Sequence, residues 1–98
     1  MAKFDKLKIA KRVKEELRSK LVRRGMIAKC GEKALLDPKG LRYPVMLPNK
    51  CQYSCKLIHA AYVRARQWKD NEIAKKALEL MDKEDCWKEL GLKREEHV

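Results

Sequence analysis

The sequence predicts a mainly α-helical protein: a small single domain with a long basic N-terminal helix, a short proline-rich β-hairpin or extended segment, and then two to three packed helices. Apolar residues recur at helical spacing over most of the chain. Proline and glycine gather in one central segment, and 98 residues suit one modest hydrophobic core. We therefore expect one helical domain over residues 1–92 and a frayed tail over residues 93–98.

The first predicted helix runs from Lys3 or Asp5 to Arg24. Gly25 follows it, and glycine readily adopts the left-handed conformation that ends many helices. An apolar stripe at three- and four-residue spacing supports the helix and consists of Leu7, Ala10, Val13, Leu17 and Leu21. We expect this stripe to be buried against the later helices.

A β-hairpin is predicted around residues 37–40. Asp37, Pro38 and Gly40 occupy the first, second and fourth positions of a type I turn. Short apolar stretches at 34–36 and 41–43 flank this turn on both sides. The sequence therefore predicts two short strands joined at Pro38.

Three further helices are predicted after Pro48. The second helix begins at Asn49, which forms a capping-box pattern with Gln52, and runs to about residue 69. The third is capped by Asp70 or Asn71, and its buried face consists of Ile73, Ala74, Ala77, Leu78 and Met81. A short last helix covers residues 82–90 and ends at Gly91.

The four cysteines leave three alternatives open. Buried thiols are favoured, because free cysteine is among the residues most often buried. A zinc site could use Cys51, Cys55 and His59 on one side of the second helix, but no C-x₂-C or C-x₄-C knuckle is present. A disulfide is the third alternative, although Cys51 and Cys55, four residues apart on a regular helix, cannot bridge each other comfortably. We expect no metal and no cofactor.

The aromatic and histidine side chains are expected to serve packing. His59 is interpreted as a residue on the flank of its helix rather than a ligand or base. Trp68 and Trp87 are interpreted as core or interface anchors rather than platforms on which bases stack.

The charge of the chain is strongly positive, with a net value of +11. Residues 49–69 carry five basic and no acidic residues. Rows of Lys and Arg gain free energy on a phosphate backbone by releasing its condensed counterions. The residues expected to contact phosphate are Lys8, Lys11, Arg12, Arg18, Arg23, Arg42, Lys56, Arg64 and Arg66.

These patterns predict a small basic nucleic-acid-binding protein that is not an enzyme and acts through phosphate contacts with DNA or RNA. The alternative is a protein-interaction module that docks on an acidic partner or self-associates. The chain has no Thr and only two Ser, which leaves few nucleophiles for catalysis. We expect no transmembrane segment and a cytoplasmic location, since no apolar run approaches about 18 residues and no secretory signal is apparent.

One stretch resembles small modules found in phage genomes. It runs from Leu36 to Leu80 and combines Asp37 with Arg42-Tyr43-Pro44, an alanine-rich helix and an Ile-x-Lys-Lys-Ala helix. The resemblance covers less than half of the chain and implies an origin in a mobile element rather than a specific activity.

Overall fold

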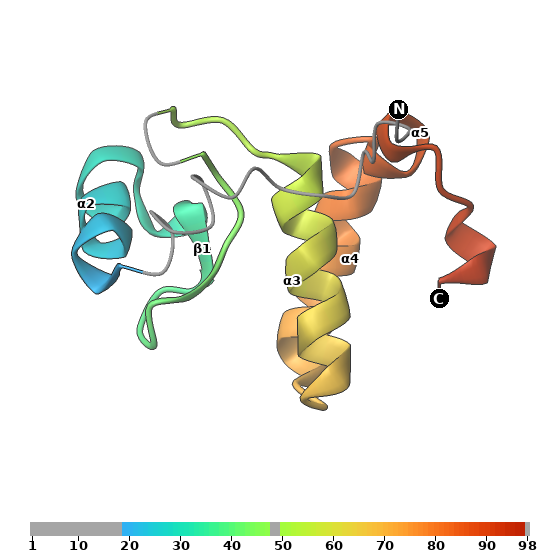
Figure 1. Cartoon of the computed structure of the whole chain (residues 1–98), viewed down its shortest axis with the longest axis horizontal. Helices are drawn as coiled ribbons and strands as arrows, with labels where there is room; N and C mark the ends of the chain where they lie inside the picture. Colours follow the sequence, from blue (N-terminus) through green and yellow to red (C-terminus); the bar gives the residue numbers. More distant parts are fainter. Residues whose placement is uncertain (1–18, 48–49, 98) are drawn as a thin grey trace, which may run out of the picture.

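The computed structural model describes residues 19–47 and 50–97. Its helices are α2 (Lys20–Cys30), α3 (Cys55–Gln67), α4 (Asn71–Lys83) and α5 (Cys86–Leu90). Two strands, β1 (Leu35–Asp37) and β2 (Arg42–Pro44), form an antiparallel hairpin, and the 3₁₀ turns η1 and η2 span Glu32–Ala34 and Arg94–Glu96. The predicted class, mainly helical with a small hairpin, is confirmed. Helix α2 and the hairpin lie to one side of α3, and α5 and the C-terminal tail lie to the other (Figure 1).

The end predicted for the first helix is wrong. Ser19 is extended, and its hydroxyl accepts a hydrogen bond from the Val22 backbone N–H, so a helix begins at Lys20. That helix continues through Gly25 and ends at Gly31, which has a positive φ. Leu21, expected to be buried, is 78% exposed. The rest of the predicted long basic helix lies outside the described residues.

The predicted hairpin is confirmed, and its turn depends on Asp37 and Gly40. The Gly40 N–H donates to Oδ1 of Asp37 over 3.1 Å. A Cβ at position 40 would lie 2.6 Å from Oδ2 of the same carboxylate, so a larger residue would displace it. Glycine is therefore required here by the close approach of the aspartate side chain.

The hairpin separates two hydrophobic clusters. Leu35 belongs to the cluster on the α2 side, with Met26 and Met46, whereas its neighbour Leu36 belongs to the main cluster. Val45 belongs to the main cluster and Met46 to the cluster on the α2 side, because consecutive residues of an extended chain point to opposite faces. The small sheet is thus buried on both faces.

The predicted start of the second helix at Asn49 is also wrong. The Ser54 N–H donates to the Val45 carbonyl over 2.9 Å, and Tyr53 pairs with Met46 in an antiparallel bridge. The chain therefore continues the sheet before it becomes helical. Helix α3 begins at Cys55, with the Ser54 hydroxyl as its N-terminal cap.

Helices α3 and α4 form the helical hairpin that carries most of the main cluster. On α4, Ile73, Ala77 and Met81 are buried as predicted, while Ala74 and Leu78 are partly buried. Tyr62 and Ile58 provide the facing side of α3. This packing confirms the predicted α4 stripe.

The short last helix, α5, ends before Gly91 as predicted, but its predicted start at Asp82 is wrong because Asp82 still belongs to α4 and α5 begins at Cys86. Asp82 accepts hydrogen bonds from Nε1 of Trp87 (2.8 Å) and from Nε of Arg94 (2.9 Å). The His97 carbonyl accepts from the Tyr62 hydroxyl over 2.8 Å. Residues 93–97, expected to fray, therefore make specific contacts with α3 and α4. None of the described helices is both long enough and apolar enough to cross a membrane.

We expect Ile58→Ala and Met81→Ala to lower the free energy of unfolding by about 2–5 kcal/mol each, because both side chains are fully buried. Leu21→Ala is the matched control and should cost less than about 0.5 kcal/mol at its exposed position. Denaturant titration measures all three. An Ile58→Ala protein as stable as the parent would contradict the described core.

Candidate nucleic-acid interface

The predicted phosphate-binding residues fall into two groups. Lys8, Lys11, Arg12 and Arg18 lie outside the described residues. The other predicted residues are distributed over α2, the hairpin and α3, and they are Arg23, Arg42, Lys56, Arg64 and Arg66. These five side chains have different surroundings.

Arg42 is engaged within the hairpin. Its Nε donates to Oδ2 of Asp37 over 2.9 Å, and its terminal nitrogen lies 2.8 Å from the same oxygen. It also lies 3.8 Å from Asp70 at the start of α4. The hydrogen bond to Asp37 raises the pKa of Arg42 and lowers that of Asp37. A phosphate would therefore compete with two carboxylates for this guanidinium.

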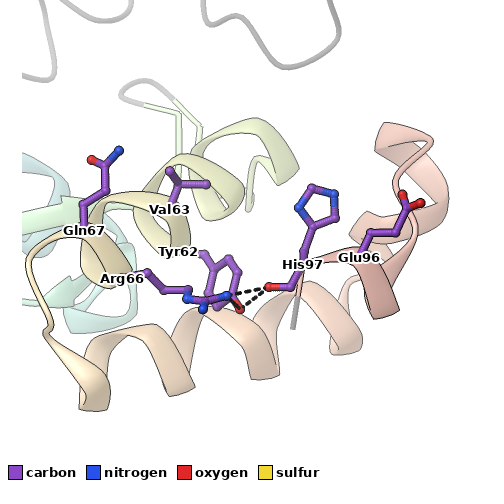
Figure 2. Close-up of a pocket in the computed structure, with 6 residues that line it drawn as sticks. All are labelled: Tyr62, Val63, Arg66, Gln67, Glu96 and His97. Atoms are coloured by element: carbon purple, nitrogen blue, oxygen red, sulfur yellow. Dashed lines mark hydrogen bonds between the residues drawn. The ribbon is translucent and has the colours of Figure 1, made fainter.

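Arg66 is engaged with the C-terminal tail (Figure 2). One guanidinium nitrogen donates to the His97 carbonyl over 2.7 Å and to the Tyr62 hydroxyl over 3.2 Å. The same group lies 5.7 Å from the centre of the Tyr62 ring, in cation–π range. Arg66 therefore helps to dock the tail on α3.

A pocket of about 440 Å³ adjoins this contact and is lined by Tyr62, Val63, Arg66, Gln67, Glu96 and His97. Figure 2 shows Arg66 and Tyr62 reaching toward the His97 backbone, while Val63 and Gln67 come from the same helix. The Arg66 and Tyr62 groups closest to the tail already hydrogen-bond to it. We interpret the pocket as the seam between α3 and the tail.

Arg23 of α2 is the predicted residue whose pKa is affected by another predicted residue, Arg64 of α3. A terminal nitrogen of Arg23 donates to the Leu41 carbonyl over 2.7 Å, which ties α2 to the hairpin. Burial lowers the pKa of Arg23, and the positive charge of Arg64 lowers it further. Arg64 is exposed on α3, whereas Lys56 is half-buried in its first turn. Two like charges are thus held within electrostatic reach of each other.

The cysteines form two disulfides, so the favoured prediction of buried thiols is wrong. Cys30 of α2 is bonded to Cys51, and Cys55 at the start of α3 is bonded to Cys86 of α5, each with a Cα–Cα distance of 5.2 Å. Cys51 precedes α3, so the proposed face of Cys51, Cys55 and His59 does not form. The zinc alternative fails because both thiols are used in disulfides. No cluster of potential metal ligands occurs among the described residues.

His59 is half-buried on α3, as expected for a flank residue. Its ring lies 5.8 Å from that of His97, and its Nε2 is buried without a hydrogen-bond partner among the described residues. Burial lowers the pKa of His59, and the charge of His97 lowers it further. Both effects disfavour the charged ring, which suits a packing role.

Sequence reasoning missed the exposure of Trp68. Trp87 is buried, as predicted, but Trp68 is 70% exposed at the end of α3. Its position four residues after Arg64 was the available signal, since residues four apart lie side by side on a helix surface.

The comparisons give this chain no relative: no protein-family model, curated protein or solved structure matches it.

We expect a dithiol reductant to open the Cys30–Cys51 bond before the Cys55–Cys86 bond. Cys51 is exposed, whereas Cys55 and Cys86 are buried and less accessible to an attacking thiolate. Loss of each cross-link should lower the free energy of unfolding by about 3–4 kcal/mol in the chain-entropy model. Differential alkylation with peptide mapping gives the order, and equal rates of reduction would contradict it.

Protonation of His59 should lower the free energy of unfolding in mild acid. Its pKa is lower in the folded protein than the unfolded value of about 6.5, so the unfolded chain binds the proton first as the pH falls. The free energy of unfolding should therefore decrease below about pH 6.5 and level off below the folded pKa. Arg42 and Arg94 lower the pKa values of Asp37 and Asp82. Protonation of these two carboxylates therefore changes the free energy of unfolding only at more acidic pH.

Urea titrations between about pH 7 and pH 5 test this prediction. His59→Gln should remove part of the decrease in that range. A variant whose stability changes with pH in parallel with the parent would show that another group is responsible.

Proposed function

We propose that the protein binds nucleic acid without catalysing a reaction, mainly through contacts with the phosphate backbone. The observation that carries the proposal is the exposed guanidinium of Arg64 on α3, within a chain of net charge +11. Its positive charge also lowers the pKa of Arg23 on α2. A phosphate bound at Arg64 would offset this charge and release counterions.

The surroundings of Arg64 support the same proposal. Residues 49–69 contain no acidic side chain, so α3 offers no carboxylate of its own to neutralise it. Arg42, Arg66 and Arg23 each make contacts inside the molecule and contribute less than the sequence suggests. We therefore assign Arg64 the main role among the described residues. The roles of Lys8, Lys11, Arg12 and Arg18 stay predictions.

The absence of catalysis is part of the proposal. The chain has no Thr, and its two serines, Ser19 and Ser54, accept hydrogen bonds as helix caps. Its cysteines are bonded to one another. These roles leave few side chains to serve as an activated nucleophile.

An acidic protein partner or self-association is the second candidate function. The observation that favours it is Leu21, 78% exposed on α2, the helix that also carries Arg23. A docking surface of this kind would depend on the leucine as well as on the charges. Leu21→Ala should then weaken association with a partner, whereas phosphate binding should be unchanged.

The cellular location of the protein and its evolutionary origin are separate proposals. The sequence predicts a cytoplasmic protein, but the two disulfides favour an oxidising environment, because cytosolic reductants keep most thiols reduced. Alkylation of thiols in intact cells distinguishes the two. An origin in a mobile element stays a prediction from the resemblance of residues 36–80.

We expect anisotropy of labelled DNA and RNA oligonucleotides to show micromolar binding at low salt that weakens linearly with log salt. Arg64→Glu should weaken binding about tenfold or more, because it replaces the phosphate-binding guanidinium with a carboxylate. Lys88→Glu is the matched control, since it changes the net charge equally on α5, away from α2 (Figure 1). It should weaken binding less than about threefold.

Two results would contradict the proposal. Nuclease-treated protein that binds no oligonucleotide at low salt would exclude phosphate binding altogether. Equal losses in Arg64→Glu and Lys88→Glu would show that net charge, rather than Arg64, determines affinity.

A further inference from the structure

An exposed tryptophan lies one helical turn from Arg64, the proposed phosphate-binding residue of α3. Trp68 is 70% exposed, whereas Trp87 is buried and its indole N–H donates to Asp82. Large aromatic side chains left in solvent are uncommon, because burying them gives so much stabilisation. Of the two predicted roles, core or interface anchor, the core role is therefore wrong for Trp68, and its exposure points to an interface.

The backbone holds Trp68 firmly at the C-terminus of α3. Its N–H donates to the Arg64 carbonyl over 3.0 Å, as in a continuing helix. Lys69 then adopts a left-handed conformation with φ of 57°, and its N–H donates to the Arg66 carbonyl. The Asp70 N–H donates to the Ala65 carbonyl over 2.8 Å, which completes a Schellman motif. Trp68 thus projects from a hydrogen-bonded helix end rather than from a loose loop.

The side chains around Trp68 form one exposed stripe on α3. The stripe lies opposite the buried face and consists of Ala60, Val63, Arg64, Gln67 and Trp68. Arg64 and Trp68 are four residues apart and therefore adjacent on the helix surface. Arg23 adds a second positive charge within electrostatic reach of Arg64, and exposed Lys69 follows Trp68. The acidic residue that comes next, Asp70, lies 3.8 Å from Arg42.

We propose that this surface binds single-stranded nucleic acid, with an unpaired base stacked on Trp68 and the adjacent phosphate held by Arg64. An aromatic ring beside basic side chains is the combination that binds single strands, because every base has a π-face and every nucleotide a negative charge. A duplex keeps its base faces stacked on one another and cannot offer one to Trp68. The inference rests on the proposed function and adds the class of nucleic acid to it.

Tryptophan fluorescence and anisotropy test this inference together. The probes are a thymidylate or uridylate strand and a mixed-sequence duplex, each about twenty nucleotides long. We expect the single strand to bind more tightly than the duplex and to quench the exposed tryptophan. Trp68→Ala should weaken single-strand binding about tenfold, within the range measured for stacking residues.

Trp68→Phe is the matched variant. It should keep most of the affinity, because phenylalanine also stacks, but abolish the quenching, because only buried Trp87 then emits. Trp68 is exposed, so both variants should fold, and circular dichroism checks that they do.

The outcomes separate the inference from the function on which it rests. If the duplex and the single strand bind equally tightly and Trp68→Ala binds as tightly as the parent, the inference is wrong, but the proposed phosphate binding is not affected. Quenching of Trp68 by polyglutamate as strong as by the oligonucleotide would overturn it in favour of an acidic protein partner. If neither oligonucleotide binds at low salt, both the inference and the proposed function fail.

Discussion

The start of helix α3 is the constraint on which the rest of the structure depends. Cys51 and Cys55 are four residues apart, and their disulfides lead in different directions, to Cys30 of α2 and to Cys86 of α5. Cys30 belongs to the cluster on the α2 side, and Cys55 and Cys86 both belong to the main cluster. Neither cluster is large, and cross-links stabilise small folds by limiting the freedom of the unfolded chain. Helix α3 is therefore fixed against the elements on both of its sides.

This constraint explains how a repulsive arrangement of charges persists in the free protein. The Cys30–Cys51 bond and the contact of Arg23 with the Leu41 carbonyl hold α2 in place while Arg64 lies on α3. A binding site whose charges are already positioned loses less conformational entropy when a ligand arrives. Trp68, held by the hydrogen bonds of its helix end, is positioned in the same way. The proposed surface thus consists of side chains on rigid elements.

Local patterns were enough to predict the hairpin turn and the buried face of α4, because each is specified by neighbouring residues. The turn needs only the order Asp37, Pro38, Gly40, and the α4 stripe needs only helical spacing. The start of α3 could not be predicted in this way, because pairing of Ser54 with Val45 competes with the capping signal of Asn49. Cysteine pairing is also a long-range property, since 21 and 31 residues separate the bonded partners.

The candidate site also depends on both local and long-range contacts, and only the local ones could be predicted from the sequence. Sequence identified Arg23 and Arg64 as basic but could not show that the charge of Arg64 lowers the pKa of Arg23 on another element. It also could not show that Arg66 binds within the molecule, since the His97 carbonyl reaches it only through the fold, whereas Arg42 pairs with Asp37 across the predicted hairpin. Lys69 adopts a positive φ although it is not glycine, so the sequence has no glycine there to predict where α3 ends.

The central claim is tested most directly by following each backbone amide in a nitrogen–proton correlation spectrum while a single-stranded oligonucleotide is added at low salt. The account predicts that the shifted amides cluster from Arg64 to Lys69, together with the indole N–H of Trp68, while α5 is little affected. Shifts centred on α5 or on the seam between Arg66 and the tail would contradict it.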